Sequence, residues 1–355
     1  MDNRGMGALC TARGAAGAAL LLAAGLTIAG CGAGPAAGGR GEAGEEAVAD
    51  PGAGSRPAGP YVRAVGTVQD GGLPHAACTC ERCELARNDP AARRWVASLA
   101  VVLPPEGGGA GKVYLIDATP DVRPQLDRLS DVRDGGRPSG RVDRSPVDGV
   151  LLTHAHVGHY LGLAFFGFEA VHTRKLPVFC TAAMADYLRR NGPWSQLVDL
   201  GNIEPLAVAP GKSFELGAGV RASAVAVPHR DELSDTVGFL LEGPRRRLLY
   251  VPDTDAWEAW DPPLTERLRG VDVAVLDGTF FSTDEVPGRD VSSIGHPLIR
   301  RSMDLLEPLV RSGETAVYFT HMNHSNPVLE AGSEARRAVE ERGFHVLAEG
   351  REIEL

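Results

Sequence analysis

The segment at residues 147–160 limits what this chain can fold into more than any other part of it. An apolar run at residues 147–152 is followed by His154, His156 and His159, three of the chain's ten histidines. A short apolar run bounded by turn residues predicts a buried strand, which places the histidines in the following turn and at the start of the next helix. Imidazole is the commonest ligand of zinc-like ions, so the first two histidines can bind one ion and the third, a helical turn farther on, can bind a second. The alternative is a cluster of exposed or hydrogen-bonded histidines, but packing does not explain three histidines so close together.

Three further candidate ligands each stand at the end of an apolar run. With the runs that precede them, they are His229 after residues 220–227, Asp253 after residues 247–252 and His321 after residues 315–320. Together with the three earlier histidines, this order resembles the H-x-H-x-D-H motif and the later ligands of the metallo-β-lactamase superfamily. The resemblance implies a metal site formed by all of these residues. It also implies catalytic roles for Asp253, as the bridging ligand, and for His321.

The chain departs from this motif at one position. Gly158 stands where the motif has aspartate, so the second metal position is expected to have only His159, Asp253 and His321 as ligands. Because a carboxylate is missing, we expect the first ion to bind tightly and the second weakly, and we expect Gly158→Asp to raise the metal content. Two tightly bound ions would instead indicate that another ligand, such as Asp255 or a water, replaces the missing carboxylate.

The distribution of apolar and turn residues after residue 60 predicts strands and helices in one domain, residues 61–355. Runs rich in β-branched and aromatic residues predict strands at residues 61–68, 98–103, 112–118, 147–153, 177–180, 212–216, 220–227, 236–242, 247–251, 271–277 and 315–320. Helical spacing and capping residues predict helices at residues 122–129, 181–191, 297–312 and 333–342. This mixture suits an α/β fold in which two mixed β-sheets pack face to face with helices outside. The superfamily resemblance implies the same αββα sandwich.

A second cluster of candidate ligands lies near the start of this domain. Cys78, Cys80 and Cys83 have a C-x-C-x-x-C spacing, which lets three thiolates converge on one tetrahedral ion. His324, three residues after His321, is a candidate fourth ligand, and the four residues predict a structural zinc site. The cyclic phosphodiesterase of phosphonate metabolism, a superfamily member, has a similar zinc site completed by a histidine at that spacing. Disulfides are the alternative, because an exported protein meets oxidising conditions, but three cysteines make an awkward set for pairing.

The resemblance is closer to the family of coenzyme PQQ synthesis protein B, and it extends over most of residues 61–355. The matching stretches are residues 78–83, 117–123, 277–282, 295–297, 323–327 and 350–355. That family typically lacks the paired His154 and His156, tends to have asparagine where His324 stands, and in most copies lacks a lipoprotein signal. The chain therefore resembles a relative that carries a more hydrolase-like metal site on the same scaffold.

Two mechanisms are compatible with these candidate ligands. A hydrolase would use metal-activated water to attack an ester, amide or phosphodiester, and the paired histidines favour it because they restore the first metal position. An oxygenase would use iron, and the resemblance implies hydroxylation of a tyrosine-derived precursor. A third possibility is a non-catalytic protein that carries PQQ or its precursor.

The first segment of the chain predicts export rather than folded structure. Arg4 and Arg13 precede an apolar stretch at residues 15–26, and the segment that ends in Gly30-Cys31 resembles a bacterial lipobox. This implies a signal peptide at residues 1–30, lipid attachment to Cys31, and location on the periplasmic or cell-surface side of a bacterial membrane. The apolar stretch is short for a membrane span of about 20 residues. A plain secretory signal and a short anchor helix are the alternatives.

The composition indicates the character of the remaining segment and the kinds of partner that the protein can bind. Residues 31–60 are rich in glycine, alanine and proline, which predicts a disordered tether. The formal net charge of −10 argues against a nucleic-acid partner, because binding a phosphate backbone needs a basic surface. A small-molecule substrate is expected, and the sequence does not indicate an oligomeric state. His296 and Trp194 are candidate substrate-binding residues, with a helix-start role and a packing role as the respective alternatives.

Overall fold

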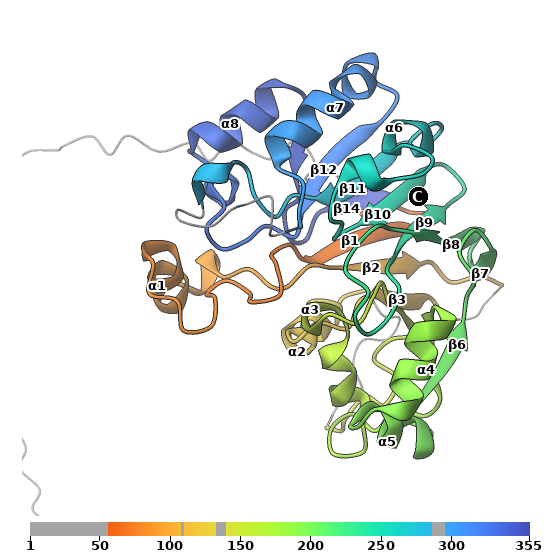
Figure 1. Ribbon diagram of the computed structural model, residues 1–355. Coiled ribbons are helices and arrows are strands. Elements are labelled where there is room, and N and C mark those ends of the chain that lie inside the picture. Colours follow the sequence, from red (N-terminus) through yellow and green to blue (C-terminus); the bar gives the residue numbers. More distant parts are fainter. Residues whose placement is uncertain (1–55, 108–109, 133–139, 286–294) are drawn as a thin grey trace, which may run out of the picture. The chain divides into compact units, whose positions relative to one another are not determined.

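The computed structural model describes residues 56–107, 110–132, 140–285 and 295–355. These residues form two mixed β-sheets of seven strands each with helices on their outer faces (Figure 1), which confirms the predicted αββα sandwich. The strands of the first sheet, in spatial order, are β14 (Glu352–Glu354), β1 (Tyr61–Gly66), β2 (Ser98–Leu103), β3 (Lys112–Ile116), β4 (Gly149–Leu151), β5 (Leu176–Cys180) and β6 (Ile203–Ala207). Those of the second sheet are β13 (His345–Val346), β12 (Ala316–Thr320), β11 (Val273–Asp277), β10 (Arg247–Val251), β9 (Val237–Glu242), β8 (Val220–Ala226) and β7 (Ser213–Gly217).

The two sheets follow the same plan, with one antiparallel and one parallel half. Strands β3 to β6 are parallel in the first sheet, and strands β10 to β13 are parallel in the second. The last strand, β14, pairs with β1 of the first sheet, so that Tyr61 lies opposite Glu354. The carboxyl ends of parallel strands are where α/β folds gather the side chains of a site.

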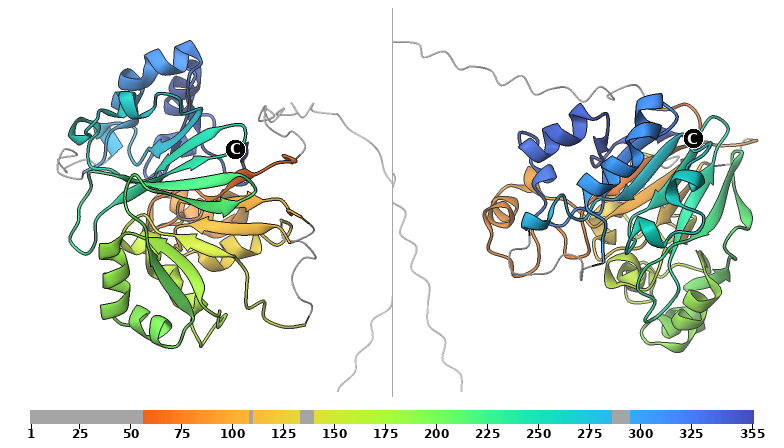
Figure 2. Two further views of the ribbon diagram at one scale, coloured as in Figure 1. Left: turned by 90° about the vertical axis from the view of Figure 1, so that its right-hand side faces the viewer. Right: turned by 45° about the horizontal axis from the view of Figure 1, so that its top comes forward.

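Helices lie on the outer side of each sheet, as the views in Figure 2 show. The helices are α1 (Glu81–Asn88), which lies at one end of the sandwich (Figure 1), α2 (Val122–Asp127), α3 (Val157–Tyr160), α4 (Ala182–Arg190), α5 (Trp194–Asp199), α6 (Leu264–Arg267), α7 (Ile299–Ser312) and α8 (Glu334–Glu341). Three large apolar clusters match the interfaces of this sandwich. One lies between the sheets, one packs Met184 of α4 against the first sheet, and one packs Met303 of α7 against the second.

Strand β2 shows how the sequence produces these layers. All residues of Ser98–Leu103 are buried. Leu99 and Val101 belong to the cluster between the sheets, whereas Ala100 and Val102 belong to the cluster beneath the helices. Because successive side chains point to opposite faces, a strand covered on both sides has a continuous apolar sequence.

The structure adds elements that the sequence pattern does not predict. Strand β6 contains Pro205, which cannot donate a backbone hydrogen bond, and it lies at the edge of its sheet, where that loss is tolerated. Helix α1 has Cys80 at its N-cap without a side-chain hydrogen bond, so it lacks the usual capping signal. Strand β4 is confirmed but covers Gly149–Leu151 instead of residues 147–153.

The end of the predicted tether is attached to the folded domain. Arg56 forms ion pairs with Asp131, which follows α2, and with Glu352 of β14. These contacts hold the last residues of the segment 31–60, for which the composition predicted disorder. The predicted signal peptide and Cys31 lie outside the described residues. Within the residues that the structure describes, no helix combines the length and the apolar character needed to cross a bilayer.

Candidate metal centre

Most of the predicted ligands gather at the carboxyl ends of parallel strands from both sheets, and His229 follows the antiparallel strand β8. His154 and His156 lie in the loop after β4, and His159 lies in α3, which is the local arrangement that the sequence predicts. Asp253 follows β10 and His321 follows β12. Ligands distant in the sequence therefore meet at one edge of the sandwich.

A first group of ligand atoms comes from His154, His156, His229 and Asp253. Nδ1 of His156 lies 2.9 Å from Nε2 of His154 and 3.1 Å from Nε2 of His229. Oδ2 of Asp253 lies 3.4 Å from Nε2 of His154, and Oδ1 of Asp253 lies 3.4 Å from Nε2 of His229. Atoms bound tetrahedrally to zinc at about 2.0 to 2.1 Å lie about 3.3 Å from one another. The four side chains therefore have the spacing of a tetrahedral metal shell.

Carboxylates support this first group through the other ring nitrogens. Nδ1 of His154 lies 3.0 Å from the Thr153 hydroxyl, which donates to Asp117 at 2.9 Å. Nδ1 of His229 lies 2.8 Å from Asp255. Such contacts place the proton on Nδ1 and leave Nε2 free to bind a metal ion.

A second group of ligand atoms lies beside the first and also faces Asp253. Nε2 of His159 lies 3.5 Å and Nε2 of His321 lies 3.8 Å from Oδ2 of Asp253. Oδ1 of Asp70, in the loop between β1 and α1, lies 3.3 Å from Nε2 of His321 and 3.5 Å from Nε2 of His159. The second position therefore includes a carboxylate that the sequence analysis did not identify.

This geometry corrects the expectations attached to Gly158. The second position does not lack a carboxylate, because Asp70 lies there. Asp255 is not the replacement, because it lies against Nδ1 of His229. A Cβ atom on Gly158 would lie 2.1 Å from Oδ1 of Asp70. Gly158→Asp is therefore expected to clash with Asp70 and not to add a ligand to the native site.

Buried aspartates also support the histidines of the second group. Nδ1 of His159 lies 2.7 Å from Asp117. Nδ1 of His321 lies 3.0 Å from the Thr279 hydroxyl, which donates to Asp277 at 2.8 Å. Asp117 and His321 have φ angles of 70° and 61°, a left-handed conformation that costs about 1 to 3 kcal/mol and is held by surrounding structure at functional sites.

Unsatisfied buried atoms test whether a metal ion fits here. Nε2 of His159 and Oδ1 of Asp253 are buried without a hydrogen-bond partner among the described residues. Every ion pair that the described residues form with Asp253 comes from a histidine, and none comes from lysine or arginine. Burying an ionised carboxylate is costly unless it is paired or binds a metal. The donor set of imidazoles and carboxylates therefore fits a divalent cation such as zinc.

Burial and charge also set the protonation of the ligands. Burial raises the pKa of Asp253, but the charges of His321 and His296 outweigh it and hold that pKa well below its usual value. Burial holds the pKa of His154 well below its usual value. Asp253 is therefore held as a carboxylate anion and His154 as a neutral imidazole, the forms that bind metal ions. Burial lowers the pKa of His159, but the neighbouring Asp117 outweighs it and raises that pKa well above its usual value.

Of the two predicted substrate-binding residues, His296 lies at the metal centre and Trp194 lies in the core. Nδ1 of His296 is 2.8 Å from Asp277 and 3.3 Å from Asp253. Burial lowers the pKa of His296, but the charges of Asp277 and Asp253 outweigh it and raise that pKa to about 9. Trp194 is 7% exposed, and its ring packs 4.6 Å from that of Tyr160. This position matches the packing alternative for Trp194.

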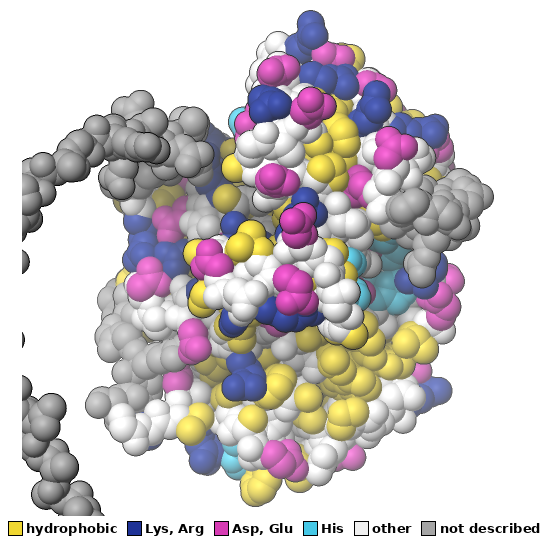
Figure 3. Space-filling model, turned by 90° about the vertical axis from the view of Figure 1, so that its left-hand side faces the viewer, with side chains coloured by type: hydrophobic (Ala, Val, Ile, Leu, Met, Phe, Trp, Pro, Cys, Tyr) yellow, Lys and Arg dark blue, Asp and Glu magenta, His cyan; other side chains and the backbone are white. Residues whose placement is uncertain are grey.

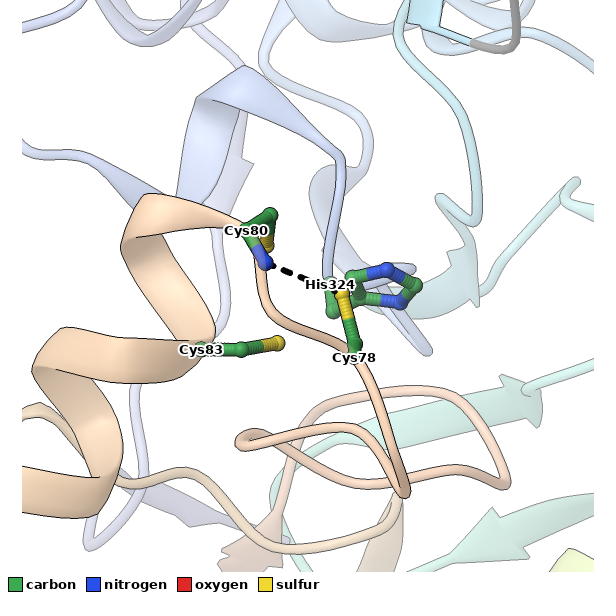
Figure 4. A group of neighbouring side chains, drawn as sticks. All are labelled: Cys78, Cys80, Cys83 and His324. Carbon is green, nitrogen blue, oxygen red and sulfur yellow. Dashed lines mark hydrogen bonds between the residues drawn. The ribbon is translucent and has the colours of Figure 1, made fainter.

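The residues of the predicted structural zinc site also lie together (Figure 4). The ligand atoms of Cys78, Cys80, Cys83 and His324 are all within 4.8 Å of one another. These three cysteines and Cys180 are free thiols, so the disulfide alternative finds no support among the described cysteines. Nδ1 of His324 is buried without a hydrogen-bond partner. A tetrahedral ion would satisfy that nitrogen and the three sulfurs together. We call these four residues the cysteine site.

Sequence reasoning missed several residues of the metal centre. Asp117 and Asp277 each stand at the end of an apolar strand, which is the same sequence signal that Asp253 and His321 give. Thr153 and Thr279 become meaningful only through their contacts with these aspartates. Asp70 gives no sequence signal, because it lies in a glycine-rich turn far from the other ligands.

The metal centre reaches the surface in a hollow where histidine side chains gather (Figure 3). The side chain of His156 is 16% exposed, whereas that of His154 is 1% exposed. Beside these histidines, α3 exposes Val157, and the following 3-10 helix exposes Leu161. A substrate can therefore approach from the His156 side and meet apolar side chains there.

Comparisons with known proteins agree with this geometry. The family model described as the Beta-lactamase superfamily domain matches residues 112–322. Coenzyme PQQ synthesis protein B of Rhizobium meliloti (strain 1021) is 31% identical over 316 residues, which covers 82% of this chain and 96% of that protein. The protein of the same name from Methylobacterium sp. (strain 4-46) is 28% identical over 308 residues, which covers 81% and 97%.

Solved structures share the fold. Zn(2+)-bound PqqB from Methylobacterium extorquens has a TM-score of 0.68 at 24% identity, covering 83% of this chain and 100% of that chain. A diphosphatase from the PhnP family has a TM-score of 0.56 at 22% identity, covering 83% and 96%. The family match and the 31% identity carry the assignment, and the structural likenesses support the fold. The chain belongs to the metallo-β-lactamase superfamily and, within it, to the family of coenzyme PQQ synthesis protein B.

Proposed function

We propose that this protein is a metal-dependent hydrolase that acts on a small-molecule ester, amide or phosphodiester. The observation that carries the proposal is the first ligand group, in which paired His154 and His156 converge with His229 and Asp253 at tetrahedral spacing. Catalytic zinc sites use histidine and carboxylate ligands and leave a position for water or substrate. Superfamily members are mostly hydrolases, which agrees with this assignment.

The chemistry divides between a bound ion and the residues of this chain. When bound, a divalent cation supplies Lewis-acid activation of water and of the scissile group near neutral pH. Asp253 faces histidines of both ligand groups and so fixes their separation. Asp277 holds Nδ1 of His296, which leaves Nε2 as the nitrogen that exchanges a proton with the leaving group.

Among the three substrate classes, a phosphodiester is favoured. Two ligand groups that face one shared carboxylate suit a pair of cations, and paired cations stabilise the attacking and leaving oxygens of a phosphoryl group. The structural likeness to a diphosphatase points in the same direction.

Iron-dependent hydroxylation of a tyrosine-derived precursor is the second candidate function. The similarity to coenzyme PQQ synthesis protein B over 82% of this chain favours it. Mixed imidazole and carboxylate ligands with open positions are also a set that iron uses. A carrier of PQQ or its precursor would use the same groups to hold a ligand without transforming it.

Chelation followed by reloading tests the hydrolase proposal. The purified protein is assayed on a phosphodiester, ester and lactam panel before chelation, after chelation, and after addition of Zn²⁺, Mn²⁺ or Fe²⁺. We expect hydrolysis of at least one class, its loss on chelation and its recovery with Zn²⁺ or Mn²⁺. Hydrolysis that survives complete metal removal, or the absence of hydrolysis with every ion, would contradict the proposal.

We also propose that the protein is exported and anchored by a lipid on Cys31, as the motif at residues 28–31 and the short apolar stretch before it indicate. Cys31→Ala is expected to move the protein from membrane fractions to soluble ones or to block its maturation. Cys10→Ala, which changes a cysteine inside the signal itself, is the matched control and should leave fractionation unchanged. Fractionation and intact mass measure both effects. A Cys31→Ala protein that differs in mass only by the substitution and keeps its membrane association would refute the anchor.

A further inference from the structure

We infer that Asp70 is the carboxylate ligand of the second metal position and replaces the aspartate that the H-x-H-x-D-H motif has where this chain has Gly158. The replacement comes from a different part of the chain, the loop between β1 and α1. The inference depends on the metal centre that the proposed function uses. Its test counts bound ions, so it can fail while the hydrolase proposal stands.

The distances around Asp70 match those of a shared metal shell. Oδ1 of Asp70 lies 3.3 Å from Nε2 of His321 and 3.5 Å from Nε2 of His159. Oδ2 of Asp253 completes the set at 3.5 and 3.8 Å from the same two nitrogens. A tetrahedral zinc shell has separations of about 3.3 Å between its donor atoms. Asp70, His159 and His321 therefore form one candidate ligand group, and Asp253 faces both of its histidines.

The hydrogen-bond network assigns lone pairs to the nitrogens that face Asp70. Nδ1 of His159 lies 2.7 Å from the Asp117 carboxylate, which can only accept, so Nδ1 carries the proton. The Thr279 hydroxyl donates to a buried carboxylate and therefore accepts from Nδ1 of His321. In the neutral rings, both Nε2 atoms are then acceptors. Such acceptors lie stably beside a carboxylate oxygen only when a cation lies between them or when the rings take up a proton.

Backbone pairing fixes Asp70 beside one of its partner histidines. The segment before Asp70 pairs with the residue after His321, because the amide of Met322 donates to Thr67 and the amide of Gln69 donates to Met322. These bonds are 3.0 and 2.9 Å long. A pre-positioned ligand loses little conformational freedom when an ion binds. The loop therefore presents Asp70 as part of the rigid site.

The space around Gly158 explains why only one of the two positions can carry the carboxylate. A Cβ atom on Gly158 would lie 2.1 Å from Oδ1, 2.5 Å from Cγ and 3.0 Å from Cα of Asp70. The two shortest contacts are with the Asp70 side chain and disappear when that side chain is removed, whereas the 3.0 Å contact with its Cα needs only a small shift. Aspartate at position 158 and aspartate at position 70 therefore exclude each other, and glycine at 158 is what makes room for Asp70.

The first experiment compares Asp70→Asn with a matched control. Zinc per chain is measured by elemental analysis at buffered free Zn²⁺, and zinc affinity is measured by competition with a chromogenic chelator. Asp70→Asn keeps the shape of the side chain but loses its charge, so we expect it to bind one zinc ion fewer, with affinity at the second position at least about tenfold weaker. Asp121→Asn is the control, because Asp121 lines the same surface pocket without belonging to a ligand group, and it should retain the full zinc content.

An exchange of the two positions keeps the proposal testable even if a single variant folds poorly. Gly158→Asp alone should clash and lose the second ion, as should Asp70→Gly alone. The double variant Asp70→Gly/Gly158→Asp moves the carboxylate back to the motif position and should restore the second ion. Full zinc content in Asp70→Asn would show that Asp70 only pairs with protonated histidines, and it would overturn the inference. A double variant no better than its single parents would overturn the exchange of positions.

Discussion

His154→Ala is expected to abolish tight metal binding at the first position and to lower any hydrolytic rate at least about 100-fold, because even supporting residues around a metal typically change affinity or activity 10- to 100-fold. The expectation follows from the position of Nε2 of His154, which lies 2.9 Å from Nδ1 of His156 and 3.4 Å from Oδ2 of Asp253. Alanine removes one of the four converging ligand atoms and leaves the buried Asp253 carboxylate with one histidine partner fewer. Elemental analysis and steady-state kinetics measure the two effects.

His172→Ala is the matched control for this prediction. His172 lies outside the metal centre and contacts Arg144 through Nδ1 at 2.7 Å. Its loss should leave metal content and rate unchanged. If His154→Ala retained the metal content and rate of the wild-type protein, the first ligand group would not be the catalytic metal site.

Cys80→Ser is expected to remove zinc from the cysteine site and to lower stability more than catalysis. A structural zinc site with four protein ligands leaves no position for water, and its binding free energy contributes to folding. Loss of a metal is among the mechanisms behind the largest single-substitution effects, so we expect a loss of about 3 kcal/mol or more. At about 2 to 4 °C per kcal/mol for a large domain, this lowers the melting temperature by roughly 6 to 12 °C.

Cys180→Ala is the control for the cysteine site. Cys180 is a buried free thiol at the end of β5 and belongs to the core cluster beneath the helices. Its replacement should leave zinc content unchanged. Scanning calorimetry and zinc analysis of both variants check the prediction. A Cys80→Ser protein with the wild-type melting temperature and zinc content would rule out the assignment.

The sequence predicted those parts of the fold and site that depend on local pattern. Buried strands such as β2 have continuous apolar sequences, and ligands such as Asp253 follow them directly, so both could be found. Strand β6 could not, because Pro205 opposes a strand assignment and only its place at the sheet edge permits it.

The second metal position depended on contacts that no local pattern contains. Gly158 was correctly identified as a departure from the motif, but the sequence did not indicate that Asp70 lies beside His159 and His321. Asp70 enters the site only because its loop pairs with the residue after His321, and that pairing exists only in three dimensions. Trp194 illustrates the reverse case, since an aromatic residue in a turn suggested a pocket and the structure places it in the core.

Turnover of an active panel substrate in ¹⁸O-labelled water with molecular oxygen excluded distinguishes a hydrolase from an oxygenase. Metal-activated water as nucleophile requires that one oxygen of the product come from solvent. We expect full activity without molecular oxygen and one solvent-derived ¹⁸O in the product. Turnover that stops without molecular oxygen, and a product formed in its presence whose new oxygen carries no solvent label, would contradict the hydrolase and indicate the oxygenase.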